Sequence, residues 1–257
     1  MDKKEMKARK LILSTLSFTP EQLEHYALRL QEMIRCKTVS VKGSYDDTEF
    51  KKLRDTMKEL FPLVHEKSEK LTFSDDCWIY KLKGKDESRN IMVMSHHDVV
   101  EASGEWTHPA FSGEIEDGRV WGRGTLDTKG GLAMMLQAAE ELIEEGFTPK
   151  RDTFFVSSCN EETDGAGCDA ISRILQERNI ELHFVLDEGG MIKYDPIGGA
   201  KGTFAMIGVG EKACIDLKFI AKSNGGHASA PDKNTPLVRL AKFIVEAEKA
   251  ECFEVKM

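Results

Sequence analysis

The sequence has no long apolar run and no closely spaced pair of cysteines, and both absences limit what the chain can be. No stretch reaches the eighteen apolar residues of a transmembrane helix, so we expect no membrane-spanning segment. The charged first ten residues are not followed by the apolar h-region of a signal peptide, so we expect no secretory signal. The six cysteines form no C-x-x-C motif, which predicts reduced thiols in a cytoplasmic protein.

Positive charge is in deficit. Lys and Arg number 36 against 44 Asp and Glu, which gives a net charge of -8 and a pI near 5.5. An acidic surface disfavours nucleic acid and anionic membranes as partners. The sequence also lacks Gly-x-Ser-x-Gly and His-Glu-x-x-His, the motifs of serine hydrolases and of single-zinc proteases. The 40% of hydrophobic residues is enough for a sizeable core.

Residue periodicity predicts alternating helices and strands. Thr19 can cap a helix that starts at Pro20, and Gln22 can complete a capping box. Apolar residues at helical spacing predict helices over 47–60, 127–145 and 166–178. Short apolar runs predict strands at 78–82, 91–94, 120–121, 153–157 and 183–186. This alternation predicts an α/β fold with a mostly parallel sheet and helices on both of its faces.

The pattern changes near Gly210. Ile215, Leu217 and Phe219 alternate with polar residues, as in a half-exposed strand. A glycine-rich loop then leads into an amphipathic helix that starts near Pro236. We therefore expect one domain over 1–209 and the beginning of a second over 210–257. The sequence stops at Met257, before that second piece can complete a sheet.

Histidine and carboxylate groups follow four successive predicted strands. They are Ser95-His96-His97-Asp98, Asp127, Glu161-Glu162 and Asp187-Glu188. Each group alone has an ordinary structural explanation, since paired charges usually lie on a solvated surface and Asp127 could simply cap a helix. Open α/β sheets, however, bind ligands at the carboxyl ends of their strands. The joint placement of the four groups therefore predicts a metal site that is built from loops.

The residue types favour a pair of divalent cations. Crowded carboxylates repel one another, and a cation converts that repulsion into binding. Imidazole with carboxylates suits Zn²⁺, with Co²⁺ or Mn²⁺ as substitutes. His96 can bind a cation while Asp98 orients its ring, and Asp127 can bridge two cations about 3.5–4 Å apart. In Glu161-Glu162, one carboxylate can bind metal while the other serves as a general base.

On these motifs the sequence resembles the zinc exopeptidase family of acetylornithine deacetylase, succinyl-diaminopimelate desuccinylase, aminoacylase and the carboxypeptidase G and S types. The residues over 166–190 look closest to the carboxypeptidase S and N-acyl-amino-acid hydrolase branch. The matching segments are Ser95-His96-His97-Asp98-Val99-Val100, Trp106-Thr107-His108-Pro109-Ala110-Phe111, Gly122-Arg123-Gly124-Thr125-Leu126-Asp127-Thr128-Lys129-Gly130, Glu161-Glu162, Asp187-Glu188-Gly189-Gly190 and Gly225-Gly226-His227-Ala228-Ser229-Ala230-Pro231.

The resemblance implies a role for each matching residue. Two divalent cations, most simply Zn²⁺, would be held in part by four residues of this chain. These are His96, Asp127 as the bridge, Glu162, and Asp187 with Glu188 as the alternative to it. Asp98 would orient His96, and Glu161 would be the general base. His227 would reach the site of a partner subunit and polarise the scissile carbonyl.

The resemblance also implies the fold and the reaction. We expect a zinc-exopeptidase-like catalytic domain, a ferredoxin-like lid that forms a homodimer, and a cis peptide bond after Asp127. The expected activity is hydrolysis of small peptides or N-acyl amino acids by water that two metal ions activate. Members of the family return to the catalytic domain after the lid and supply a last metal-binding histidine there. The sequence contains no candidate for that histidine, so we expect a fragment of low or no activity.

Two other classes of function remain open. A nucleotide-binding domain is suggested by Gly122-x-Gly124 before a helix, but Asp127 occupies the third glycine position and would repel a pyrophosphate. A non-catalytic relative could keep the fold as a binding or dimerisation module. Metal analysis distinguishes both classes from an enzyme. The sequence does not choose among dipeptides, N-acyl amino acids and succinylated diamino acids.

Overall fold

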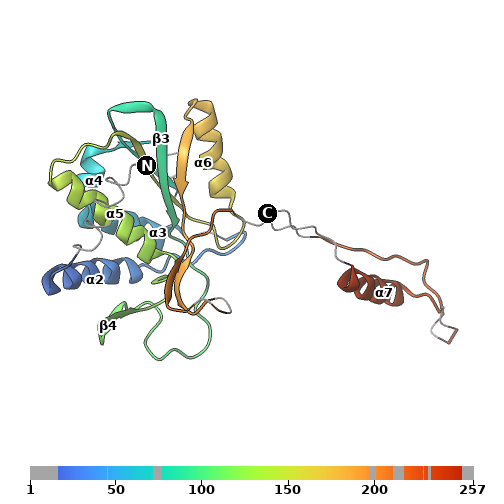
Figure 1. Ribbon diagram of the computed structural model, residues 1–257. Helices are drawn as coiled ribbons and strands as arrows, with labels where there is room; N and C mark the ends of the chain where they lie inside the picture. Colours follow the sequence, from blue (N-terminus) through green and yellow to red (C-terminus); the bar gives the residue numbers. More distant parts are fainter. Residues whose placement is uncertain are drawn as a thin grey trace. The chain divides into compact units, whose positions relative to one another are not determined.

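The chain consists of two compact units, Met1–Gly190 and Met191–Met257 (Figure 1). The computed structural model describes residues 17–44, 46–71, 77–196, 199, 201–210, 217–227, 229–230 and 233–250. No helix within these ranges is both long enough and apolar enough to cross a membrane.

The first unit is built on a five-stranded sheet with the order β1-β2-β6-β3-β7. β3 is parallel to both β6 and β7, whereas β2 is antiparallel to both β1 and β6. The bounds are β1 Glu69–Lys70, β2 Trp78–Leu82, β6 Arg151–Ser158, β3 Asp86–His96 and β7 Leu182–Leu186. The α/β class is confirmed, but the mostly parallel sheet is not, because two of these four pairings are antiparallel.

The antiparallel direction of β2 has a simple cause. Only Lys83, Gly84 and Lys85 separate β2 from β3, and a crossover between parallel strands needs a dozen residues or more. The chain therefore reverses direction between these two strands. β6 lies between them, parallel to β3 and so antiparallel to β2.

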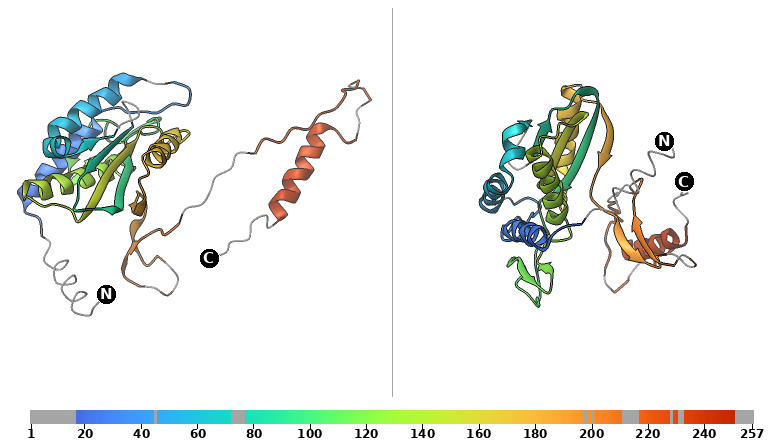
Figure 2. Two further views of the ribbon diagram at one scale, coloured as in Figure 1. Left: turned by 90° about the horizontal axis from the view of Figure 1, so that it is seen from above. Right: turned by 60° about the vertical axis from the view of Figure 1, so that its left-hand side comes forward.

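Helices cover both faces of the sheet, as predicted (Figure 2). Neighbouring residues of β6 belong to opposite faces: Phe155 packs in one core cluster, and Phe154 and Val156 in the other. Leu136 of α5 lies in the first cluster, and Ile171 of α6 lies in the second. The first face is covered by α2 Pro20–Ile34, α3 Asp47–Leu60, α4 Pro62–Lys67 and α5 Lys129–Glu144, and the second by α6 Ala166–Glu177.

The helix boundaries follow from local signals. The Thr19 hydroxyl accepts a hydrogen bond from the Gln22 backbone N–H at 3.2 Å, and the Gln22 side chain accepts one from the Thr19 N–H at 2.9 Å. This is the predicted capping box, with Pro20 in the first turn. The helix predicted from Asp127 begins at Lys129 instead.

The predicted strand at 120–121 exists but lies outside the central sheet. It belongs to β5 Arg119–Trp121, which pairs only with β4 Glu114–Glu116 among the described strands. Asp117 and Gly118 between them have φ values of 51° and 72°, the left-handed conformation of a two-residue hairpin turn. Asp127 is therefore presented by a loop after a hairpin and not by the end of a central strand.

The second unit contains an antiparallel pair of strands and one helix. β8 Met191–Tyr194 pairs with β9 Thr203–Met206, and neither was predicted. α7 Pro236–Lys249 starts where predicted, with the Thr235 hydroxyl accepting a hydrogen bond from the Val238 N–H at 3.3 Å. Within the predicted strand over 215–219, residues 215 and 216 lie outside the described ranges and 217–219 form no strand. The ferredoxin-like lid is not confirmed, and the division at 209/210 stays a prediction.

Candidate metal centre

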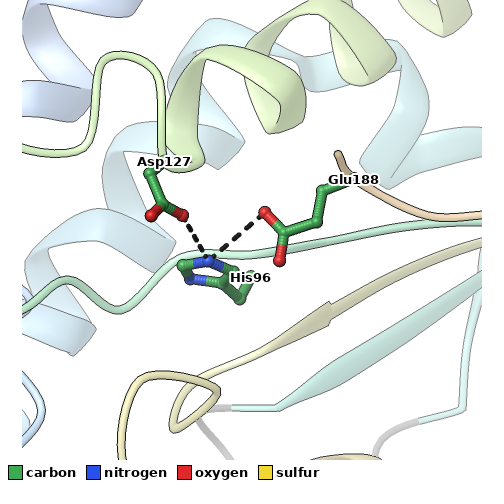
Figure 3. A group of neighbouring side chains, drawn as sticks. All are labelled: His96, Asp127 and Glu188. Carbon is green, nitrogen blue, oxygen red and sulfur yellow. Dashed lines mark hydrogen bonds and ion pairs between the residues drawn. The ribbon is translucent and has the colours of Figure 1, made fainter. Parts of the chain in front are cut away.

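His96 is the buried centre of the candidate site (Figure 3). It is the last residue of β3, and only 2% of its surface is exposed. Its Nε2 lies 3.0 Å from Asp127 Oδ1 and 3.4 Å from Glu188 Oε2. One donor atom from each of these three residues falls within 4.8 Å of the others. The end of β3 and the loops after β5 and β7 therefore meet at one point.

Asp98 fixes the orientation of the His96 ring. The second ring nitrogen, Nδ1, lies 3.3 Å from Asp98 Oδ1 and 3.0 Å from the Asp98 carbonyl oxygen. Ser40 donates to Asp98 Oδ2 at 2.6 Å, and the backbone N–H groups of Glu161 and Glu162 donate to the two carboxylate oxygens at 3.1 Å each. Burial alone would raise the pKa of Asp98, but the hydrogen bonds from His96 and Ser40 hold it below its usual value. The carboxylate therefore stays charged and leaves Nε2 pointing at the site.

Glu161 and Glu162 follow β6 on the same sheet edge. Glu161 Oε2 lies 3.8 Å from His96 Nε2. Burial raises the pKa of both carboxyl groups, and so do neighbouring carboxylates, among them Asp127 and Asp98, while His96 opposes the shift. The site thus gathers more negative charge than its own residues neutralise, which is the electrostatic condition for binding a cation.

Burial and the neighbouring carboxylates act in opposite directions on the pKa of His96. Burial by itself lowers the pKa of His96, but hydrogen bonds and charges from Asp98 and Glu188 raise it to about 11. A metal ligand must be neutral imidazole, so cation binding has to displace a proton from the ring.

His97, the next residue, is a core side chain and no part of the site. Its ring stacks on Trp78 at 6.2 Å and contacts Phe50 edge-on, and its Nδ1 lies 2.7 Å from the Ser157 hydroxyl. Burial lowers the pKa of His97 to about 3, so the ring is neutral. Successive residues along a strand point to opposite faces of the sheet, which explains why His96 faces the site and His97 packs in the core.

Two glycines shape the loop that presents Asp127. A Cβ on Gly124, which has φ 89°, would lie 2.8 Å from Val99 Cγ1, and one on Gly122 would lie 2.5 Å from Ile34 Cγ2. The loop therefore packs closer to its neighbours than a side chain permits. The peptide bond between Asp127 and Thr128 is cis, as predicted.

Lys129 connects this loop to α2. Its side chain is fully buried, and Nζ donates to the carbonyl oxygens of Met33 at 3.2 Å and Cys36 at 2.6 Å, at the end of that helix. Neither Lys129 nor Ser40 was predicted to support the site. Lys129 could have been noticed as a charged residue at the start of an otherwise apolar helix face. Nothing in the sequence distinguishes Ser40 from a surface serine.

The choice between Asp187 and Glu188 stays open in the geometry. Glu188 makes the short approach to His96, and its backbone N–H donates to Asp187 Oδ1 at 2.8 Å. Val93 pairs with Leu186, so one further step along both strands sets Asp187 opposite Met94, on the face of the sheet that also bears His96. The short distance to His96 therefore favours Glu188 as the metal ligand, whereas the pairing of β3 with β7 favours Asp187.

His227 belongs to the second unit. Its side chain is exposed, and its Nδ1 lies 2.8 Å from the Ser229 hydroxyl. The neighbouring Ala228 and Pro231 of the predicted motif lie outside the described residues. The role of His227 stays a prediction.

Comparison with known proteins agrees with these motifs. The model of "Peptidase family M20/M25/M40" matches residues 92–253, more than half of the chain. The chain belongs to this family. The M20 chain is 32% identical to "Probable carboxypeptidase S-like 2" of Dictyostelium discoideum, over 93% of the chain and 51% of that protein. It is 39% identical to "N-fatty-acyl-amino acid synthase/hydrolase PM20D1" of Homo sapiens, over 66% of the chain and 34% of that protein.

These relatives are of the predicted branch, and the M20 chain spans about half the length of the first of them. Among solved structures, human carnosine dipeptidase 1 superimposes with a TM-score of 0.53 at 15% identity, over 67% of this chain and 41% of that one. At this identity the likeness shows the fold alone.

Proposed function

We propose that this M20 chain forms the metal-binding catalytic part of an amide hydrolase for small peptides or N-acyl amino acids. One observation carries the proposal: His96, Asp127 and Glu188 converge within 4.8 Å, with Glu161 beside them. Three loops distant in sequence have no structural need to bring two carboxylates to one imidazole. The family match and the relatives' names support the same class of reaction.

The donor set fits divalent cations, most simply two Zn²⁺, with Co²⁺ or Mn²⁺ as substitutes. His96 and Asp127, with Asp187 or Glu188, would hold one cation. Asp127 and Glu162 would contribute to the second. When bound, such a pair supplies Lewis acidity that polarises a carbonyl and lowers the pKa of water.

The chain's own residues supply proton transfer and orientation. Asp98 holds the His96 ring in place through Nδ1. Glu161 is half-exposed beside His96, and its raised pKa suits a general base that takes a proton from the attacking water and passes it to the leaving amine. His227 of a partner subunit would polarise the scissile carbonyl, which is the reason to propose a homodimer.

Glu161→Gln tests the proposal in a protein that holds this chain together with the last metal-binding histidine. We expect the substitution to lower turnover of an N-acyl amino acid or dipeptide by at least about 100-fold, the contribution of a positioned base. Metal content, measured by elemental analysis of the same sample, should stay unchanged. Glu177→Gln on the exposed surface of α6 is the matched control and should change neither quantity.

The substrate panel should hold N-fatty-acyl amino acids, N-acetyl amino acids and dipeptides, because the names of the relatives span hydrolase and carboxypeptidase activities. A protein that binds no divalent cation would refute the proposal. A protein that carries the complete set of metal ligands, binds cations and hydrolyses none of these amides would favour the non-catalytic module. A cytoplasmic location stays a prediction.

A further inference from the structure

Two thiols meet beside the candidate site, although 82 positions separate them in the chain. Cys77 directly precedes β2, and Cys159 directly follows β6. Their Sγ atoms lie 3.0 Å apart. A disulfide bond is about 2.05 Å long, so a combined movement of about 1 Å would join them.

The backbone at this point suits a cross-link. β2 and β6 are antiparallel, with Trp78 opposite Ser157. One further step in this register sets Cys77 opposite Ser158, next to Cys159. Cys159 lies one residue beyond the directly opposed Ser158, just after the end of β6, and the 3.0 Å between the two Sγ atoms shows that both side chains reach the same point.

The surroundings leave room for the Cys77 sulfur at this point. A Cβ on Gly167 at the start of α6 would lie 2.8 Å from Cys77 Sγ and 2.7 Å from the Asn160 Oδ1 atom. Because Gly167 has no side chain, Cys77 Sγ and Asn160 Oδ1 can both lie this close to it. Cys77 is 2% exposed, whereas Cys159 is partly exposed, so a reagent reaches Cys159 first.

We infer that Cys77 and Cys159 form a site of reversible oxidation. Exchange with a small-molecule disulfide joins the two residues in a disulfide bond. In the first step the Cys159 sulfur attacks the reagent, forms a mixed disulfide and releases one reagent thiol. In the second step Cys77 attacks the Cys159 sulfur and releases the other reagent thiol. Two protein thiols are oxidised, and one reagent disulfide is reduced to two thiols.

The cross-link would fix a loop that belongs to the site. Cys159 is followed by Asn160, whose carbonyl oxygen accepts hydrogen bonds from the N–H groups at 163, 164 and 165. The same loop places the N–H groups of Glu161 and Glu162 on Asp98. Closing the disulfide would therefore anchor the start of this loop to β2.

The exchange should be slow. A hydrogen bond to Cys77 and burial raise the pKa of the Cys159 thiol well above its usual range, and the thiolate is the reactive form. We expect the reaction to take hours.

Oxidised glutathione is the probe, and peptide mapping by mass spectrometry is the measurement. The intact chain is incubated with it, the remaining thiols are alkylated, and circular dichroism verifies that the chain stays folded. We expect a peptide that links Cys77 to Cys159 in most molecules, and its loss on reduction. Cys168→Ser is the matched control, because Cys168 is a nearby thiol of α6, and it should give the same cross-link.

Two further variants complete the test. Cys77→Ser should stop at the mixed disulfide on Cys159, and Cys159→Ser should form no cross-link to Cys77. Full alkylation of both residues in the folded wild-type chain after prolonged exposure would overturn the inference. So would a cross-link that appears only after the circular dichroism signal of the fold is lost. No outcome depends on the chain being a hydrolase.

Discussion

At the scale of single residues, Asp98 does the most to define the site. Its side chain accepts hydrogen bonds from Ser40 and from the N–H groups of Glu161 and Glu162, and it faces His96 Nδ1. One carboxylate therefore sets the ring that would bind metal and the loop that bears the base. Partners of this kind are typically worth 10–100-fold in metal affinity.

Asp187→Asn and Glu188→Gln form a pair of variants that decides which carboxylate binds the cation. We expect Asp187→Asn to lower zinc retention on dialysis by at least about 10-fold, because the strand register sets Asp187 on the face of the sheet that bears His96. Glu188→Gln should have the smaller effect, although Glu188 Oε2 lies 3.4 Å from His96 Nε2.

The opposite order of effects would make Glu188 the ligand and would leave the rest of the site unchanged. Equal and small effects would contradict the assignment of either residue. Elemental analysis after dialysis gives the measurement, and circular dichroism verifies that both variants are folded.

Most site residues could be predicted because strand ends are visible in a sequence. The positions of His96, Glu161 and Glu162 follow from short apolar runs with polar and then titratable residues after them. The partners of Ser40 and Lys129 could not be predicted, since they lie 58 and 93 residues away along the chain. Local patterns contain no information on such contacts.

At the scale of elements, caps and residue periodicity predicted the positions of helices and strands better than they predicted how the strands pair. The capping box at Thr19 fixed the start of α2, because both of its hydrogen bonds are local. The strand at 120–121 was assigned to the wrong sheet, because pairing is decided by the turn at Asp117 and Gly118. The reversal between β2 and β3 could have been predicted from the three-residue connection.

Helix α5 offers a matched test of the packing. Leu136 is fully buried against the sheet, whereas Met134, two residues earlier, is 71% exposed. Leu136→Ala should lower the free energy of unfolding by about 2–5 kcal/mol, because it removes buried methyl groups and leaves a cavity. Met134→Ala should change it by less than about 0.5 kcal/mol.

Urea denaturation followed by circular dichroism measures both changes. A Leu136→Ala variant as stable as the wild type would contradict the placement of α5 on the sheet. A large loss for Met134→Ala would show that its side chain is covered in solution.

At the scale of the whole molecule, the net charge of -8 and the crowded carboxylates favour cation binding. A cation that binds only the folded chain stabilises it by mass action. Free Zn²⁺ at 100 times its dissociation constant should add about 2.7 kcal/mol to the free energy of unfolding. Thermal melts of chelator-treated protein with increasing zinc measure this gain.

The Asp127→Asn variant is the control for the zinc titration. It should show little of the gain, because the carboxylate nearest His96 Nε2 would be neutral. Magnesium at the same concentration should also give less, since it prefers oxygen ligands alone. An equal gain for Zn²⁺ in the variant would place the bound cation elsewhere on the chain.

The sharing of Asp98 between two loops has a practical consequence for protein engineering. A designer who grafts the His96 strand and the Glu161 loop onto another scaffold cannot treat them as separate parts, because both take their geometry from the same buried carboxylate. The smallest portable unit is therefore the adjacent pair β3 and β6 together with Ser40, and scaffolds that lack two neighbouring parallel strands are unsuitable hosts.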